Sequence, residues 1–212
     1  MNEIIEKKSM PKWIKIGILI AGAILIVVGL FKIFGNDTNV LVNKFNEVQA
    51  PNAVIKNDLI SVSNILLGIG AKETNKDYTG IVSDLQTIFV KLDDAEVQIA
   101  STSAPLTELQ GIIDSSSDQS VKITGTRFID VFKLKNVAQL KMISDTRDFV
   151  NQAITFYNEM AQNKKITIDV KKFNATVSTL GVNAQSMTDI GVQYEVAAND
   201  FAKAAGFIIE SK

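Results

Sequence analysis

Residues 173–208 read FNATVSTLGVNAQSMTDIGVQYEVAANDFAKAAGFI, and this stretch decides the fold. Its apolar positions recur at alternating steps of four and three, the spacing of a helix that packs along its whole length. One column of this stripe is large, and the other is small after its first member: Phe173, Leu180, Met187, Tyr194, Phe201 and Ile208 against Val177, Ala184, Gly191, Ala198 and Ala205. Small residues let a neighbouring helix approach closely, so the stretch predicts tight antiparallel packing inside a helix bundle.

Three earlier stretches carry the same alternation of three and four, over residues 41–69, 78–99 and 142–160. The third belongs to a predicted helix over residues 126–162, whose first half is less regular and leaves its facing surface unassigned. We therefore predict an all-α protein, an elongated antiparallel four-helix bundle. Helices of about 40 residues would extend about 60 Å, which suits a bundle standing on a membrane.

The first stripe has one polar member, Asn52, beside Pro51. Proline either kinks a helix or occupies the first turn of a new one, so both descriptions fit this point. Asn52 then has two interpretations: a residue that accommodates the kink, or a buried polar residue that fixes the register of the bundle.

Polar and proline residues predict where the other helices end. Residues 70–75 form a turn or a weak spot in a longer helix, and Pro105 ends the second helix near Thr102, with a short helical turn through Leu109 and Ile113 beyond it. The polar run 114–120 is the best loop candidate. The short alternating runs 121–124 and 165–168 are interpreted as connectors, with Asp169 as the N-cap of the last helix.

Residues 16–31 contain no charge, and with their flanks they define a predicted transmembrane helix over residues 13–34. That length is enough to cross a hydrocarbon core of about 30 Å, with Trp13 at one interface and Lys15 and Lys32 able to reach the headgroups. A cleaved signal peptide is the alternative, but the A-x-A match at residues 21–23 lies in the middle of the apolar segment. We therefore expect an uncleaved anchor.

Basic residues set the expected orientation in the membrane. Four lysines precede the apolar segment (Lys7, Lys8, Lys12 and Lys15), and they outnumber those close behind it. By the positive-inside rule, residues 1–12 should be cytoplasmic and residues 36–212 should form an extracytoplasmic helical bundle. The Ile-, Lys- and Asn-rich usage is typical of a bacterial protein.

The composition excludes several kinds of chemistry. There are 212 residues with no His and no Cys, which removes zinc sites built on these residues, iron–sulfur clusters, disulfides and Ser–His or Cys–His catalytic pairs. Lys plus Arg is 22 and Asp plus Glu is 23, a net charge of −1, which argues against nucleic acid as a partner. No phosphate-binding glycine loop is present. We expect no catalytic, cofactor-binding or metal-binding residue, no cofactor, and no enzymatic activity.

Two groups of residues could be mistaken for sites. The carboxylates Asp93, Asp94 and Glu96, and the pair Asp114 and Asp118, are interpreted as solvated surface because neither has the spacing of a known metal loop. The aromatic residues Phe156, Tyr157 and Tyr194 could line a ligand pocket, but two of them fall on the helix stripes, so core packing is the better interpretation.

Two short stretches resemble the LemA family of membrane-anchored helical proteins. They are residues 38–42 (TNVLV) followed by residues 58–60 (DLI), and, near the end, Tyr194, Ala197, Ala198, Asp200 and Phe201. The chain departs from the family where Lys56-Asn57 replaces an arginine pair and where Ser61 replaces a proline. The resemblance implies an N-terminal membrane helix followed by long helices, and it supplies no active site.

These observations lead to an expectation about function. We expect a membrane-anchored helical scaffold or accessory protein in the cell membrane that binds other membrane proteins, or further copies of itself, with the bilayer as its other partner. The alternative is a ligand-sensing helical ectodomain that acts through a partner, because bundles on a membrane helix resemble the sensing domains of chemoreceptors.

Overall fold

The computed structural model describes residues 40–207, and within them it contains six α-helices and no strand. The helices are α2 (Val40–Gln49), α3 (Pro51–Thr74), α4 (Tyr78–Ser101), α5 (Ser103–Ser115), α6 (Gln119–Ala161) and α7 (Val170–Ala204). The prediction of an all-α protein is confirmed. The predicted transmembrane helix over residues 13–34 and the predicted cytoplasmic segment 1–12 lie outside the described residues.

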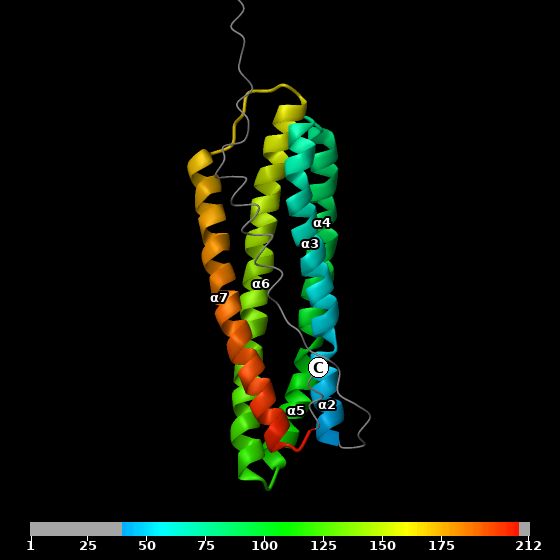
Figure 1. Cartoon of the computed structure of the whole chain (residues 1–212), viewed down its shortest axis with the longest axis vertical. Helices are drawn as coiled ribbons and strands as arrows, with labels where there is room; N and C mark the ends of the chain where they lie inside the picture. Colours follow the sequence, from blue (N-terminus) through cyan, green and yellow to red (C-terminus); the bar gives the residue numbers. More distant parts are fainter. Residues whose placement is uncertain (1–39, 208–212) are drawn as a thin grey trace, which may run out of the picture.

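The six helices form four long rods, because α2 runs into α3 and α4 runs into α5 (Figure 1). Ala50 alone separates α2 from α3, and its backbone stays helical. Pro51 is the first residue of α3, so the proline marks a kink at which a new helix begins. Taken together, α2 and α3 (Val40–Thr74) are long and apolar enough to cross a membrane, judged by length and composition alone. Core helices of soluble bundles meet that criterion too, and here Ile55, Leu59 and Leu66 are buried in the core.

Several boundaries differ from the predictions. Residues 121–124 are not a connector: they lie inside α6, which starts at Gln119 because the Asp118 side chain accepts hydrogen bonds from the backbone N–H groups of Ser120 and Val121. Helix α3 continues through the predicted weak spot to Thr74, and α5 extends to Ser115, so the polar loop is only a short connection. Pro105 sits in the first turn of α5, where its missing N–H costs little, and α4 ends before it at Ser101, as predicted.

Other local predictions are confirmed. The helical path breaks at Thr102, between α4 and α5. Residues 165–168 form an extended connector, and the Asp169 carboxylate accepts hydrogen bonds from the N–H groups of Lys171 and Lys172 at the start of α7. Such a cap contributes about 1 kcal/mol to a helix end.

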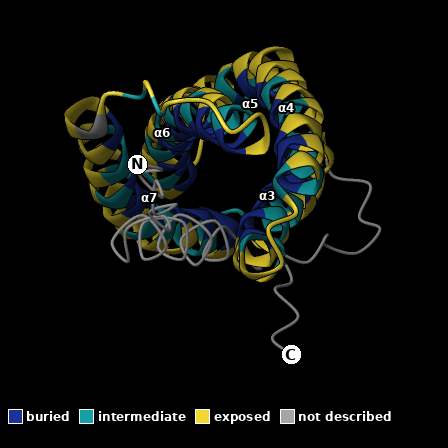
Figure 2. Cartoon of the chain, turned by 90° about the horizontal axis from the view of Figure 1, so that it is seen from above, coloured by how far each residue is buried: buried dark blue, intermediate teal, exposed yellow. Residues whose placement is uncertain are grey.

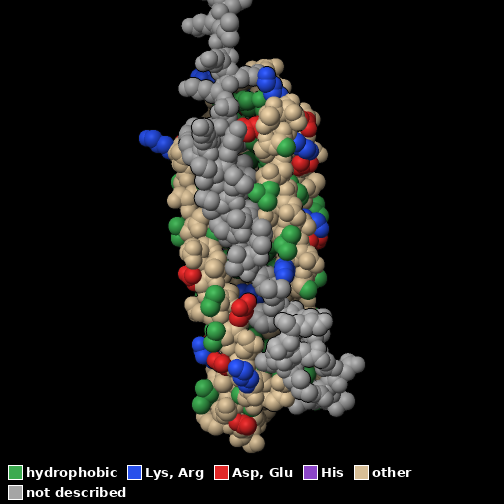
Figure 3. Space-filling model, in the orientation of Figure 1, with side chains coloured by type: hydrophobic (Ala, Val, Ile, Leu, Met, Phe, Trp, Pro, Cys, Tyr) green, Lys and Arg blue, Asp and Glu red, His purple; other side chains and the backbone are tan. Residues whose placement is uncertain are grey.

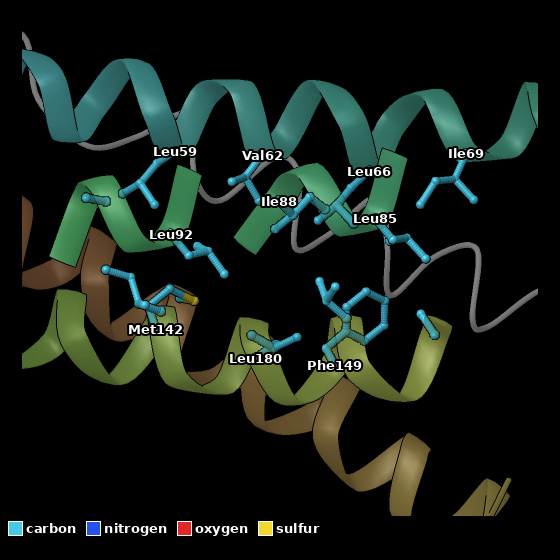
Figure 4. Packing of buried hydrophobic residues seen from close by; sticks show 14 of the residues in the cluster. Leu59, Val62, Leu66, Ile69, Leu85, Ile88, Leu92, Met142, Phe149 and Leu180 are labelled. Carbon is cyan, nitrogen blue, oxygen red and sulfur yellow. The ribbon is translucent and has the colours of Figure 1, made fainter. Parts of the chain in front are cut away.

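Buried residues gather in two clusters, one above the other along the bundle. The upper core joins α3, α4, α6 and the first half of α7, and Figure 4 shows Leu59, Val62 and Leu66 of α3 directed toward Leu85, Ile88 and Leu92 of α4. The lower core joins α2, α5, the start of α6 and the end of α7. Seen from above, the buried faces of the rods point to a common centre (Figure 2). Core packing of the predicted aromatic group is confirmed: Phe156, Tyr157 and Tyr194 are all buried.

One side of the bundle is not closed by backbone packing. Helix α3 packs on α4, α4 on α6 and α6 on α7, but within residues 40–207 no Cα atom of α3 lies within 8 Å of one in α7. Low in the bundle, side chains span this side, where Asn52 of α3 meets Tyr194 and Phe45 of α2 meets Phe201. We call this the α3–α7 side.

Candidate functional site: a buried polar layer

A layer of polar side chains separates the upper core from the lower core. All four rods contribute to it, and its members are Gln49, Asn52, Thr102, Lys135, Asn136, Gln139 and Tyr194. The two helix breaks, at Ala50 and Thr102, fall at the same level. We call this set the polar layer.

Lys135 of α6 is the centre of the polar layer. Its side chain is only 4% exposed, and its Nζ donates a hydrogen bond of 2.7 Å to Asn52 Oδ1 on α3. The same nitrogen lies 4.3 Å from the centroid of the Tyr194 ring and 5.5 Å from that of Phe132. The electron-rich faces of these rings attract an ammonium group, so they partly replace the water it has lost.

Burial dominates the electrostatics of this lysine. It lowers the pKa of Lys135 from its ordinary value of 10.5 to about 7, because the charged form loses its hydration. Among residues 40–207, no carboxylate lies within ion-pair distance of Nζ to offset this loss. Buried charges in proteins are normally paired, and Lys135 is an exception.

The neighbouring amides form a short chain of hydrogen bonds. Asn52 Nδ2 donates to Gln49 Oε1 at 2.7 Å and to the Tyr194 hydroxyl at 3.2 Å, and that hydroxyl in turn donates to Gln49 Oε1. Burial raises the pKa of Tyr194 well above its ordinary range, so this hydroxyl stays protonated and keeps donating. The chain fixes Asn52 so that its carbonyl oxygen faces Lys135.

Other polar atoms of the layer have no hydrogen-bond partner in the described part of the chain. Both the Oε1 and the Nε2 of Gln139 are buried without one, and so are Gln49 Nε2 and Asn136 Oδ1. Leaving a buried polar atom unpaired costs about 1–3 kcal/mol, so native proteins normally satisfy it with a side chain, a water or a ligand. The layer therefore has free donors and acceptors beside a buried cation.

A hydrogen bond joins the break between α4 and α5 to the polar layer. Asn136 Nδ2 donates to Thr102 Oγ1 at 2.8 Å, and that hydroxyl donates to the carbonyl of Ile99 at 2.7 Å. A carbonyl that the helix leaves unpaired at its end is thus satisfied by a side chain. This contact holds α6 against the point where the second rod is interrupted.

The sequence pattern indicated Asn52 but missed Lys135. Asn52 is half-buried and reaches Lys135 and Tyr194 across the bundle, which favours a polar residue that fixes register over a residue that merely accommodates the kink. Lys135 and Gln139 continue the stripe of α6 downward from Met142 by steps of three and four. Extending the stripe in this way would have identified Lys135, but a charged residue is not expected in an apolar stripe.

The acidic groups do not assemble a site. Asp93 and Glu96 of α4 pair with Arg147 of α6 on the surface, and Asp114 accepts a hydrogen bond from Gln110. No group of three or more acidic side chains that could hold a metal ion occurs in residues 40–207. The absence of a metal, a cofactor or a catalytic residue stays a prediction for the whole chain.

The α3–α7 side is a second candidate, as a surface. Thr176 and Asn183 of α7 bind side chains of α6, namely Gln152 and Asp145. Val177 and Ala184 each follow one of these residues directly, so they are turned about 100° around the helix from the residues that bind α6. The small column of α7 therefore lines the side that no described backbone closes.

Comparison of the chain with protein-family models, with curated proteins and with solved structures finds no match in any of the three.

Proposed function

We propose that this chain is a membrane-anchored helical accessory protein, without catalysis, whose α3–α7 side binds a helix of another membrane protein. The observation that carries the proposal is the small column on that side. A column of small residues lets two helices approach closely, yet no Cα atom of α3 comes within 8 Å of one in α7.

The exposure of α7 limits where a partner helix could contact this side. Leu59 and Leu66 of α3 and Ala184 of α7 are buried in the upper core, so they are not available to a partner. Gly181 and Thr188 of α7 are only half-buried, so the partner helix in this proposal would contact α7 there. The exposed apolar side chains visible in Figure 3 are dispersed, and single exposed residues of this kind need no partner.

The membrane anchor in this proposal rests on the sequence. Residues 13–34 have the length and composition of a membrane helix, and the preceding lysines place residues 36–212 outside the cytoplasm. A partner in the same membrane would then need no high affinity in solution, because anchoring confines both proteins to one surface. The LemA resemblance, which stays a prediction, implies the same arrangement.

The test combines capture with crosslinking from a defined face. A photoreactive amino acid replaces Thr188, which lies on the small-column face one turn from Ala184 and from Gly191, or Val97, which is 64% exposed on α4. Each full-length protein is irradiated in its native membranes, extracted in mild detergent and analysed by mass spectrometry. We expect a stoichiometric membrane protein crosslinked through position 188 and not through position 97.

A matched pair of variants tests whether close approach is required. Gly181 shares the face of Thr188, seven residues before it, and an added Cβ there would meet nothing within 4 Å, so Gly181→Leu leaves the fold intact and blocks the approach. Gly111→Leu on α5 makes the same change at another open glycine. Loss of the crosslink in the first variant alone supports the proposal. Crosslinks only between copies of this chain, or an equal yield from both positions, would overturn it.

The second candidate is a ligand-sensing ectodomain that acts through a partner, and the polar layer is the observation that favours it. A sensor of this kind would bind its ligand between the helices, where the layer offers unpaired polar atoms.

A further inference from the structure

We propose that the polar layer is a binding site for one small monocarboxylate ion of one or two carbons, held by Lys135 Nζ and by the side-chain amide nitrogens of Gln139 and Gln49. This site rests on the second candidate function above, a ligand bound between the helices, and it does not need the partner helix.

The charge of the layer sets the sign of the ligand. Lys135 brings one ammonium group into the bundle, and its neighbours at that level are neutral: Asn52, Gln139 and the protonated hydroxyl of Tyr194. An anion of single charge would neutralise the ammonium group, whereas a cation would be repelled. A dianion such as sulfate would leave one buried negative charge unpaired, which is costly.

The donors of the layer select oxygen atoms. Gln139 is 1% exposed, and it lies one helical turn above Lys135 on the same face of α6. Its Nε2 and that of Gln49 are both buried without an acceptor in residues 40–207, and Lys135 has donors beyond the one that it gives to Asn52. A carboxylate can accept several hydrogen bonds on its two oxygens, and charge-assisted bonds are the stronger kind.

The packing around α7 sets the size. Gly191 lies one turn from Tyr194, whose ring is under Lys135 Nζ, and a Cβ added at Gly191 would meet nothing within 4 Å. Gly191 is half-buried and lies between the buried Ala184 and Ala198 of the same column, so the side chain that it lacks leaves a space at the edge of the layer. It is on the scale of one missing side chain, which fits formate or acetate.

The test measures thermal unfolding of the full-length protein in detergent micelles by circular dichroism at pH 6. Sodium formate or acetate is titrated at constant ionic strength against chloride and against sulfate. We expect a saturable rise in Tm with a carboxylate, about 5–10 °C at a hundred times its Kd, and no saturable rise with sulfate. Chloride is the other small monoanion, and saturation by chloride with equal affinity would overturn the assignment of a carboxylate.

Three variants place the effect in the layer. Lys135→Met removes the ammonium group at similar volume, and Gln139→Met removes one amide while keeping the lysine. Lys141→Met is the control, because Lys141 is an exposed lysine on the same helix. We expect the carboxylate-dependent rise to vanish in Lys135→Met, to need at least tenfold more ligand in Gln139→Met, and to persist in Lys141→Met. An unchanged rise in Gln139→Met overturns the proposal, even where Lys135→Met fails to fold.

The pH dependence distinguishes this site from general salt effects. With a pKa near 7, Lys135 is mostly charged at pH 6 and mostly neutral at pH 8, so the carboxylate should bind about tenfold more weakly at pH 8. The facing groups do not titrate in this range: α2 and α3 present Gln49 and Asn52, the α4–α5 break presents Thr102, and Tyr194 of α7 has a raised pKa. An affinity independent of pH between 6 and 8 would overturn the role of Lys135.

Discussion

The upper and lower cores solve the same packing problem with different side chains. In the lower core, Phe45 of α2 lies with its ring centroid 5.6 Å from that of Phe201 on α7 and 5.0 Å from that of Phe128 on α6. In the upper core, α3 buries aliphatic residues together with Ser63 and Asp58 but no aromatic residue, and its backbone stays more than 8 Å from that of α7. Aromatic side chains are long enough to reach across the bundle without backbone contact, as Phe45 reaches Phe201.

The largest expected effect concerns the aromatic bridge. Phe201 is fully buried and contacts Phe45, Phe128 and Phe207, so Phe201→Ala should lower the free energy of unfolding by about 3–5 kcal/mol in urea titrations. Val192→Ala, at an exposed position of the same helix, should change it by less than about 0.5 kcal/mol. A loss below about 1 kcal/mol in Phe201→Ala would mean that the lower core does not depend on this ring.

The second effect is a dependence of folding stability on pH, and it comes from Lys135, which lies between the two cores. Lys135 has a pKa of about 7 in the folded protein against 10.5 when unfolded, so between these values the unfolded chain binds the extra proton. Stability should therefore rise with pH by up to about 1.4 kcal/mol per pH unit, and it is lost as the pH falls from 10.5 toward 7.

The measurement compares the wild type with Lys135→Met in urea titrations from pH 7 to 9.5, below the range where tyrosines of the unfolded chain ionise, and in carboxylate-free buffer. The difference between the two proteins isolates Lys135, because the other titrating groups are common to both. Parallel pH profiles would show that the lysine keeps its ordinary pKa in the folded protein.

Two glycines give the third comparison, with opposite signs. An added Cβ at Gly125 in the lower core would lie 2.8 Å from Ile113 Cδ1 and 2.9 Å from Phe201 Cε2, so Gly125→Ala should cost about 1–3 kcal/mol. Gly191→Ala meets nothing within 4 Å and gains helix propensity, so it should stabilise by about 0.5–1 kcal/mol. Thermal unfolding of both variants checks this, and equal signs would contradict the difference in packing.

The smallest effect is on the surface beside the upper core. Arg147 pairs with Asp93 and with Glu96, the latter at 2.7 Å. Arg147→Met should cost about 0.2–1 kcal/mol at low salt and less at 1 M salt, because water and ions screen exposed pairs. Arg127→Met, which breaks a single exposed pair with Asp200, should cost less still. A loss in Arg147→Met that does not change with salt would point to packing instead of charge.

Most of the helices could be predicted from the sequence because three of the rods carry one continuous stripe, and the fourth carries one over its second half. The stripe of the second rod even continues across the break, from Ile99 through Thr102 to Leu106, Leu109 and Ile113, all of them buried. The start of α6 could not be placed in the same way. Residues 121–124 alternate like a strand, and only the cap at Asp118 and the burial of Val121 show that they belong to the helix.

The candidate site was less predictable than the fold. A stripe identifies which face of a helix is buried, but not which other rod that face meets, so the meeting of Asn52 with Lys135 required the three-dimensional arrangement. The open α3–α7 side was equally hidden. The small column predicted close packing against a neighbouring helix. Helix α6 packs on α7, but its hydrogen bonds go to Thr176 and Asn183, which lie beside that column.

The two interruptions, at Ala50 and Thr102, have a consequence for motion. Helices α6 and α7 cross the polar layer unbroken, whereas the other two rods each change helix there. The lower part of the molecule is therefore joined to the upper part by two unbroken helices and by two helix breaks at one height, beside buried polar atoms that lack a hydrogen-bond partner within residues 40–207. Amide hydrogen exchange should then divide the protein into two cooperative units at this height, and the unit that contains α2 and α5 should open first.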